Sequence, residues 1–213
     1  MDLFGEAAEH DWMQFEEMAL RQGYCSVAGV DEAGRGALAG PVIAAAVVFP
    51  RGAVIPGIND SKKLTPAQRD GLFGLIMDKA LAVGVGSGDH LLIDRINILQ
   101  ATLSAMKDAV LSISPNPDYL IIDGISKIPV NIHQRTIKKG DSTSISIAAA
   151  SIIAKVTRDR LMEGFENQYP GYGFAGHKGY GCAAHLEAIA RLGPCMIHRK
   201  TFRGVREHVK SGE

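Results

Sequence analysis

The chain has 213 residues, of which 46% are apolar and 22% are charged, a composition ordinary for one globular domain or at most two. Its 23 basic and 23 acidic side chains cancel, which on average argues against a basic nucleic-acid-binding protein and against an acidic disordered tail. The average conceals an asymmetry, because residues 1–130 hold 10 basic and 16 acidic side chains whereas residues 131–213 hold 13 and 7. This division is compatible with a carboxylate site in the first part and a polyanion-binding surface in the second.

Near the N-terminus, apolar side chains recur at helical spacing and predict an amphipathic helix within an extension at residues 1–22; they are Phe4, Ala8, Trp12, Phe15 and Ala19. Further along, short Val-rich or apolar runs predict strands, and longer capped runs predict helices. The expected strands are 25–30, 42–49, 81–85, 119–122 and 134–137, and the expected helices are 66–80, 96–113, 144–168 and 183–192. Strands interleaved with helices indicate an α/β fold with a central, largely buried sheet.

No repeat, linker or low-complexity tract divides the chain, so we expect a single domain over residues 1–213, in which 170–213 form a helical and basic C-terminal portion.

The first 20 residues hold six acidic side chains and no Lys or Arg, unlike a secretory signal. The longest uncharged run, at 36–50, is too short to span a membrane, which takes about 20 residues. Three cysteines suggest no disulfide framework. These features predict a cytoplasmic protein without a membrane partner.

Carboxylates stand directly where predicted strands end. Asp31 and Glu32 follow one apolar run, Asp123 follows another, and Asp141 precedes the long helix. Burying such charges is costly, and carboxylates that converge repel one another unless a cation joins them. A hard, oxygen-preferring dication such as Mg²⁺ or Mn²⁺ would meet that need. Two simpler interpretations stay open at this point, in which Asp123 only belongs to a turn and Asp141 only caps a helix.

The segment after the first two acids is rich in glycine. Residues 34–39 match a relaxed dinucleotide-binding pattern, G-x-G-x-x-A. That pattern must open a helix, but a Gly-Pro pair and a predicted strand follow here, so a dinucleotide-dependent enzyme is the weaker hypothesis. Gly34, Arg35 and Gly36 instead offer bare backbone that a ligand can approach closely, together with a guanidinium group suited to phosphate.

The C-terminal part interleaves aromatic and basic side chains. Tyr180 and Lys178 belong to a Gly/Tyr-rich segment, 168–180, that could stack on sugars or bases and pair with phosphates. A loop that merely packs on the body is the alternative. Further candidate phosphate contacts are Lys62, Lys138, Lys139, Arg191, Arg199, Lys200, Arg203 and Arg206.

Two Cys-x2-His pairs loosely resemble zinc ligands. They are Cys182 with His185 and Cys195 with His198. Their spacing is atypical of structural zinc sites, which usually combine Cys-x2-Cys or His-x3-His pairs. We therefore rank a zinc site below a purely structural role for these side chains.

Taken jointly, the motifs resemble those of bacterial ribonuclease HII, in the same order, over about residues 27–205. They are residues 29–36 (GVDEAGRG), 59–64 (NDSKKL), 121–124 (IIDG), 139–142 (KGDS), 151–160 (SIIAKVTRDR), 172–174 (YGF) and 177–180 (HKGY). The resemblance implies a ribonuclease H-like fold with a mixed five-stranded sheet and additional C-terminal helices. It also implies an endonuclease that degrades the RNA of RNA–DNA hybrids and incises duplex DNA 5′ to an embedded ribonucleotide, leaving 3′-hydroxyl and 5′-phosphate ends.

The same resemblance assigns roles to individual residues. The family's catalytic and metal-binding carboxylates, which hold two Mn²⁺ or Mg²⁺ ions, correspond to Asp31, Glu32, Asp123 and Asp141. Its substrate-binding residues correspond to Gly34, Arg35, Gly36 and Tyr180, which read the 2′-hydroxyl, and we add Lys62 and Lys178 as phosphate contacts. A monomer that binds RNA–DNA hybrid and ribonucleotide-containing duplex is expected. The competing hypotheses are a dinucleotide-dependent enzyme, a non-catalytic nucleic-acid-binding module and a different metal nuclease of similar fold.

Overall fold

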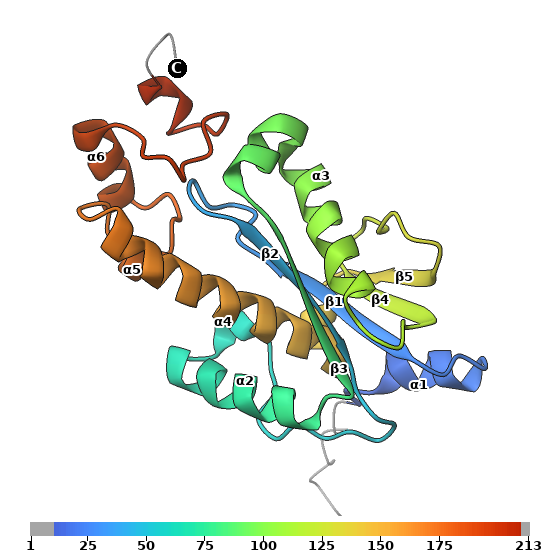
Figure 1. Ribbon diagram of the computed structural model, residues 1–213. Helices are drawn as coiled ribbons and strands as arrows, with labels where there is room; N and C mark the ends of the chain where they lie inside the picture. Colours follow the sequence, from blue (N-terminus) through green and yellow to red (C-terminus); the bar gives the residue numbers. More distant parts are fainter. Residues whose placement is uncertain (1–10, 210–213) are drawn as a thin grey trace, which may run out of the picture.

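A computed structural model of the chain describes residues 11–209, and its ribbon is drawn in Figure 1. Phe4 and Ala8, which belong to the predicted N-terminal helix, lie outside the described residues. The strands are β1 (Val27–Ala33), β2 (Val42–Val48), β3 (Ala82–Gly88), β4 (Tyr119–Asp123) and β5 (His133–Ile137). The helices are α1 (Gln14–Arg21), α2 (Pro66–Lys79), α3 (His90–Leu111), α4 (Ile145–Gln168), α5 (Phe174–His177) and α6 (Ala183–Leu192), with short 3-10 turns η1 (Ser61–Lys63), η2 (Gly140–Ser142) and η3 (Arg206–His208).

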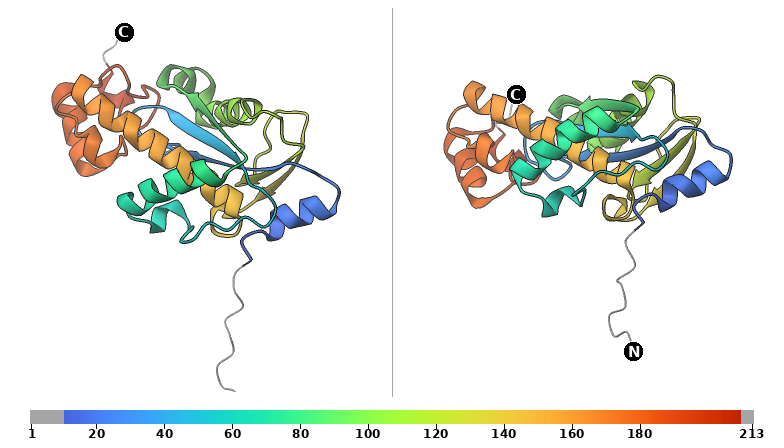
Figure 2. Two further views of the ribbon diagram at one scale, coloured as in Figure 1. Left: turned by 60° about the horizontal axis from the view of Figure 1, so that its bottom comes forward. Right: turned by 90° about the horizontal axis from the view of Figure 1, so that it is seen from below.

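The five strands form one mixed sheet in the order β3-β2-β1-β4-β5. Strand β2 runs antiparallel to both β1 and β3, whereas β4 runs parallel to both β1 and β5. Helices α4 and α2 cover one face and α3 covers the other, as the views in Figures 1 and 2 show. The predicted α/β fold with a mixed five-stranded sheet is therefore confirmed.

Both faces of the sheet are buried, so β2 is apolar on each side. Its residues Ile43, Ala45 and Val47 pack toward α4, and Val42 and Ala44 pack toward α3, as the two-residue period of a strand requires. The sequence of β2 is accordingly a continuous apolar run rather than an alternating one. The described part of the chain contains no helix long and apolar enough to cross a membrane.

The boundaries of β3 and α3 differ from the expectation, each for a local reason. Strand β3 continues to Gly88, and its glycines let it lie close to α3. A Cβ at Gly84 or Gly86 would overlap backbone atoms of that helix. Helix α3 begins at His90 rather than at residue 96, since the Asp89 side chain accepts a hydrogen bond from the Leu92 amide at 2.7 Å and caps the helix. Asn97, with φ of 69°, then interrupts it.

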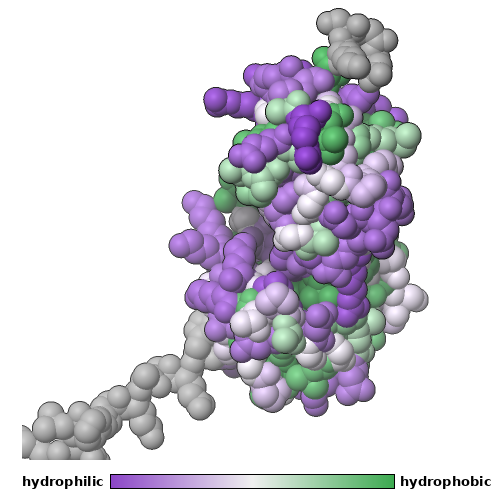
Figure 3. All heavy atoms as spheres, turned by 90° about the vertical axis from the view of Figure 1, so that its left-hand side faces the viewer, coloured by the Kyte–Doolittle hydropathy of each residue, from purple (hydrophilic) through white to green (hydrophobic). Residues whose placement is uncertain are grey.

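The C-terminal portion packs on the end of α4 through a cluster of its own. The cluster joins Met162 of α4 to Tyr172, Phe174, Ala188 and Ile197. Seen from this end, the surface is mostly hydrophilic with a few apolar side chains between the polar ones (Figure 3). Exposed apolar side chains of α4 and of this portion are Leu161, Leu186, Leu192 and Met196.

Candidate active site

Four carboxylates predicted from the sequence come from three elements at one end of the sheet. Strand β1 runs through Asp31 and Glu32 instead of ending before them, because both residues pair with β2. The register of β1 and β4 sets Val30 beside Ile122, so the next positions, Asp31 and Asp123, are neighbours on parallel strands. Asp31 lies on the α4 face, where the Ser151 hydroxyl donates a hydrogen bond to it.

Burial and mutual repulsion act on these acids together. Burial is the largest cause that raises the pKa of Asp31 well above its usual value, and the charges of Glu32 and Asp123 raise it further. The pKa of Asp123 is raised by burial and by Asp141, against a hydrogen bond from Gly140. Burial also raises the pKa of Glu32, with Arg35 opposing. The four carboxylates therefore form one electrostatic unit.

Local hydrogen bonds fix Asp123 and the backbone around Asp141. The Gly140 amide donates to Asp123 Oδ1 at 2.7 Å, which ties η2 to the end of β4. Ser144, not Asp141, caps α4, because its hydroxyl accepts from the Ile147 amide at 3.2 Å. The interpretation of Asp141 as a helix cap is therefore wrong, and the charge of its side chain acts on Asp123.

Two cations already lie against the acids. Lys62 Nζ is 3.2 Å from Asp141 Oδ2, and Arg35 Nη1 is 3.2 Å from Glu32 Oε1. Burial works to lower the pKa of Lys62, but its hydrogen bond and charge pairing with Asp141 outweigh this and leave it raised. Lys62 was predicted as a phosphate contact, and its place beside Asp141 puts it at the acidic site.

The carboxylates suit a divalent cation by donor type and charge. Oxygen donors that repel one another are what a hard dication binds best. In the arrangement described for residues 11–209, no three Asp, Glu, His or Cys side chains converge closely enough to hold one ion. Binding an ion here would therefore require the side chains to turn inward and the cations at Asp141 and Glu32 to give way.

The glycine loop after β1 is shaped for close approach. Gly34 has φ of 95°, and a Cβ there would overlap the Arg158 side chain, so only glycine fits. Gly36 is exposed, has no such φ, and a Cβ on it would stand in open space. Strand β2, not a helix, follows this loop, which excludes the dinucleotide-binding interpretation.

Two fully buried arginines hold this loop in place, and sequence analysis missed their role. Arg158 of α4 and Arg199 are 0% exposed. Burial lowers the pKa of Arg199 to about 9, and it lowers the pKa of Arg158 as well. Arg199 was predicted to contact phosphate, which is wrong because its side chain is buried and donates only to carbonyls. The carbonyl acceptors are Gly34, Arg35 and Gly40 for Arg199 and Ala39, Pro41 and Lys178 for Arg158, at 2.7–3.1 Å.

Tyr180 lies beside the glycine loop. It forms an isolated antiparallel bridge with Ala37, and its ring packs 5.3 Å from the Arg158 guanidinium and 5.7 Å from Lys155 Nζ. Its side chain is 38% exposed. Tyr180 therefore lies next to Gly34–Gly36, although 144 positions separate it from Gly36 along the chain. Its ring packs on Arg158 and Lys155 and is partly open to solvent.

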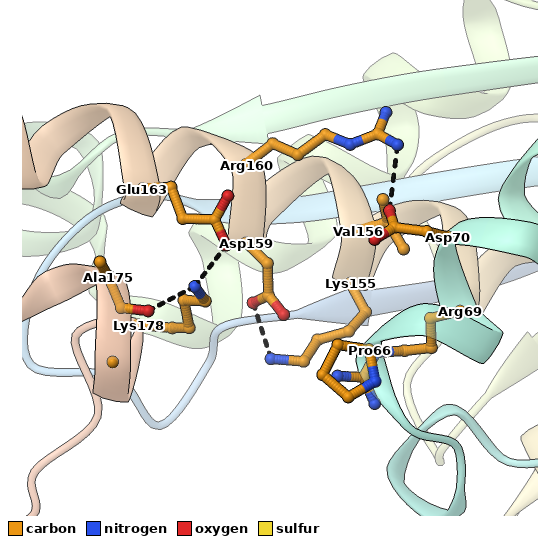
Figure 4. Close-up of a pocket in the computed structure, with 11 residues that line it drawn as sticks. Pro66, Arg69, Asp70, Lys155, Val156, Asp159, Arg160, Glu163, Ala175 and Lys178 are labelled. Atoms are coloured by element: carbon orange, nitrogen blue, oxygen red, sulfur yellow. Dashed lines mark hydrogen bonds and ion pairs between the residues drawn. The ribbon is translucent and has the colours of Figure 1, made fainter.

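Lys178 lines a groove of about 400 Å³ between α2, α4 and α5 (Figure 4). Its ammonium group donates to Glu163 and to the Ala175 carbonyl, both at 2.6 Å. A phosphate contact by Lys178 would have to replace this ion pair. Other cations of the groove are also engaged: Lys155 with Asp159, Arg160 with Asp70, and Arg69 with the Ser61 and Leu64 carbonyls.

The residues that resembled zinc ligands form a hydrogen-bonded histidine network instead. His185 Nδ1 donates to the Tyr180 carbonyl at 3.0 Å, so its Nε2 is left to accept. His198 Nδ1 accepts from the Cys195 amide at 2.9 Å, so its Nε2 carries the proton and donates to His185 Nε2 at 3.1 Å. Cys182 is exposed and stands outside the network. Both rings are neutral, and they support the backbone of Tyr180.

This network predicts a loss of stability in acid. Burial lowers the pKa of His185 and of His198 to about 4, below the unfolded value near 6.5. The unfolded chain then binds more protons, so stability present above pH 6.5 is lost as the pH falls toward 4. Raised carboxylate pKa values act in the opposite direction, so the wild type must be compared with a variant.

Between pH 7 and pH 5, we expect the unfolding free energy to fall by about 2 kcal/mol more in the wild type than in His198→Asn. Urea unfolding followed by Trp12 fluorescence measures both; equal pH slopes would refute the prediction.

Comparison with known proteins identifies the class. A model of the family described as "Ribonuclease HII" matches residues 28–205. Ribonuclease HII of Geotalea uraniireducens is 64% identical over 213 residues, covering 100% of this chain and 99% of the relative, and that of Geobacter metallireducens is 66% identical over 209 residues, covering 98% of each. Among solved structures, ribonuclease H2 of Pyrococcus horikoshii has a TM-score of 0.72 at 28% identity, over 86% of this chain and 96% of that one. A ribonuclease HIII in complex with Mn²⁺ has the same fold, with a TM-score of 0.65 at 22% identity over 89% of this chain and 71% of that one.

The fold is thus that of a ribonuclease H-like nuclease. More narrowly, the chain belongs to the ribonuclease HII family. It is an endonuclease that hydrolyses phosphodiester bonds of RNA–DNA hybrids, and enzymes of this family use divalent metal ions.

Proposed function

We propose that the protein also incises duplex DNA on the 5′ side of an embedded ribonucleotide, leaving 3′-hydroxyl and 5′-phosphate ends, and that Asp31, Glu32, Asp123 and Asp141 hold two divalent ions for the reaction. The observation that supports this most directly is the electrostatic unit of four carboxylates beside a loop in which Gly36 exposes bare backbone, next to the buried Gly34. Bound divalent ions would lower the pKa of a water molecule and neutralise charge developing on the leaving 3′-oxygen.

Each protein group has a part that its position supports. The carboxylates would bind and orient the divalent ions. Once Arg35 and Lys62 no longer pair with them, the ions would neutralise their negative charge. Lys62 Nζ, next to Asp141, is placed to meet a phosphate oxygen that enters the site. Arg35 is exposed in the glycine loop beside Glu32, and its guanidinium group could contact a phosphate oxygen in the same way.

Discrimination between ribonucleotide and deoxyribonucleotide needs a contact to the 2′-hydroxyl. We assign this contact to the backbone of Gly34–Gly36 and to the Tyr180 hydroxyl. Their adjacency through the Ala37 bridge and the rigid support from Arg158 and Arg199 favour this assignment, because a loop that reads one hydroxyl must not move.

One assay separates the hypotheses. Labelled duplexes that carry a single ribonucleotide, an all-DNA strand, an all-RNA strand or a full hybrid are incubated with Mg²⁺ or Mn²⁺ and, in parallel, with EDTA. We expect EDTA-sensitive cutting of the hybrid and of the single-ribonucleotide duplex at its 5′ side, with the two controls intact. Cutting of the hybrid alone would reject the proposed incision activity, and cutting that survives EDTA would reject the metal ions.

Gly36→Ala tests the loop without disturbing the fold. Because a Cβ at Gly36 meets nothing within 4 Å, we expect an unchanged melting temperature, within the error of the measurement. A substrate backbone that approaches the loop closely would meet the new methyl group, so kcat/KM on the single-ribonucleotide duplex should fall by about tenfold or more. Gly74→Ala, at an exposed position of α2, is the matched control and should cleave normally. Normal cleavage by Gly36→Ala would count against substrate contact at this loop.

A further inference from the structure

Glu16 of the N-terminal extension is a buried acid that the proposed reaction does not use. It lies on α1, is 3% exposed, and directs its carboxylate at the start of α4. Its Oε1 atom accepts hydrogen bonds from the Ser144 hydroxyl at 2.6 Å, from the Ser146 amide at 3.0 Å and from the Ser146 hydroxyl at 2.5 Å. Glu16 thus gathers three donors from the N-cap and the first turn of α4.

The other oxygen of this carboxylate finds no partner within residues 11–209. Among the described residues, Glu16 Oε2 accepts no hydrogen bond although it is buried. A buried carboxylate that is only half satisfied is costly, even with the favourable dipole of a helix N-terminus. An alanine or leucine at this position would avoid that cost, so packing alone does not account for the acid.

A short series of hydrogen bonds leads from Glu16 to the catalytic acids. The Ser144 amide donates to the Gly140 carbonyl at 2.9 Å, and the Gly140 amide donates to Asp123 Oδ1 at 2.7 Å. Asp141 is the next residue after Gly140. The start of α4 also presses on β1, because a Cβ at Gly29, two residues before Asp31, would overlap the backbone of Ser146 and Ile147.

The extension holds the same helix turn by a second contact. The Trp12 carbonyl accepts from the Ile145 amide at 2.8 Å, so two successive amides of α4, at 145 and 146, are bound by residues 12–16. These amides belong to the first turn of α4, where the helix itself supplies no acceptor. The extension therefore completes the N-terminal cap that Ser144 begins.

We propose that Glu16 is a positioning residue of the cleavage site, which fixes the first turn of α4 and thereby holds η2 and β1 so that Asp123, Asp141 and Asp31 can turn onto divalent ions together. This inference rests on the proposed carboxylate site and extends it to the N-terminal segment. Glu16 itself touches neither substrate nor ion.

The test combines metal binding with steady-state kinetics on an RNA–DNA hybrid. For Glu16→Ala, we expect Mn²⁺ binding, measured by calorimetry without substrate, to weaken about tenfold. We also expect kcat to fall by a similar factor while KM for the hybrid stays within about twofold, because the surface that binds the duplex is untouched. Glu17→Gln, on the same helix in an exposed ion pair with Arg21, is the matched control and should behave as wild type.

Two further variants keep the test decisive if Glu16→Ala folds poorly. Glu16→Gln retains the oxygen acceptor but loses the charge, so its effect should lie between wild type and Glu16→Ala. Ser146→Ala removes one donor to the same oxygen and should add little to Glu16→Ala in the double variant, because both act through one contact. Additive effects, or a lower melting temperature with unchanged Mn²⁺ affinity and kcat, would overturn the proposal.

The experiment distinguishes a failure of the Glu16 role from a failure of the incision activity proposed above. If the wild type fails to incise the single-ribonucleotide duplex, Mn²⁺ binding and hybrid cleavage still report on Glu16. If the wild type cleaves as proposed and the Glu16 variants match it in both readouts, only the positioning role is lost.

Discussion

Asp31→Asn should abolish cleavage of every substrate while leaving the protein folded. Asp31 is buried, and Glu32, Asp123 and the Ser151 hydroxyl all act on the charge of its carboxylate. Removing its charge would take away one of the four proposed ligands and part of the negative potential that would attract cations, so we expect kcat to fall by roughly a thousandfold or more. Gel assays on the hybrid and on the single-ribonucleotide duplex measure this loss.

The same substitution should not cost stability at neutral pH. Burial raises the pKa of Asp31 above its unfolded value, so the folded state holds its proton more tightly and stability declines as the pH rises through that interval. Asparagine carries no charge and avoids this penalty above the folded pKa. At pH 7 to 8 we therefore expect Asp31→Asn to melt at or above the wild-type temperature.

The control and the refuting results are simple. Asp78→Asn changes an exposed acid on α2 and should leave both activity and melting temperature unchanged. Full activity in Asp31→Asn would refute the carboxylate site. A strongly lowered melting temperature would refute the view that this acid is kept at the expense of stability.

Tyr180→Phe should slow cleavage at a single ribonucleotide much more than it weakens duplex binding. Phenylalanine keeps the ring that packs on Arg158 and Lys155, and it removes only the hydroxyl. If that hydroxyl contacts the 2′-hydroxyl in the transition state, its loss lowers kcat by about tenfold to a hundredfold with little change in affinity. Binding is measured by fluorescence anisotropy in Ca²⁺ or EDTA, and kcat by single-turnover cleavage.

Tyr180→Ala separates the ring from the hydroxyl. It also removes the ring from its place over the Arg158 guanidinium, so we expect a larger loss of cleavage than in Tyr180→Phe. Tyr24→Phe, against Tyr119 at the other end of the fold, is the control for losing a hydroxyl and should cleave normally. Equal losses of binding and cleavage in Tyr180→Phe would argue against sensing of the 2′-hydroxyl.

Much of the site could be predicted because its acids interrupt apolar strands. Asp31 and Asp123 stand out since a charged residue in a buried strand conflicts with its surroundings, and such conflicts mark functional sites. The element predictions succeeded for a related reason. Helix α6 has the predicted bounds, and α2 begins with Pro66 after a Thr65 capping box, because period and capping are local properties.

The supporting residues could not be found in this way. Glu16 reads as one more acid of an amphipathic helix, and Arg158 and Arg199 read as ordinary surface cations. Their roles follow from hydrogen bonds to atoms up to 165 positions away along the chain, such as Arg199 to the Gly34 carbonyl. No period or motif within a window of residues carries that information.

Residue order alone was enough for the α/β class, most of the sheet strands and, through the joint motifs, the family, and it nominated the four carboxylates that the structure brings to neighbouring elements. Those features depend on local pattern, on the cost of a buried charge and on the identity of short segments. Tertiary structure decided which side chains stabilise the site: it buried two arginines under the glycine loop, joined His185 and His198 in a neutral hydrogen-bonded network, and set Glu16 on the first turn of α4. The physical reason is that a hydrogen-bond partner is chosen by proximity in space, which the chain acquires only when the sheet and its helical layers close together.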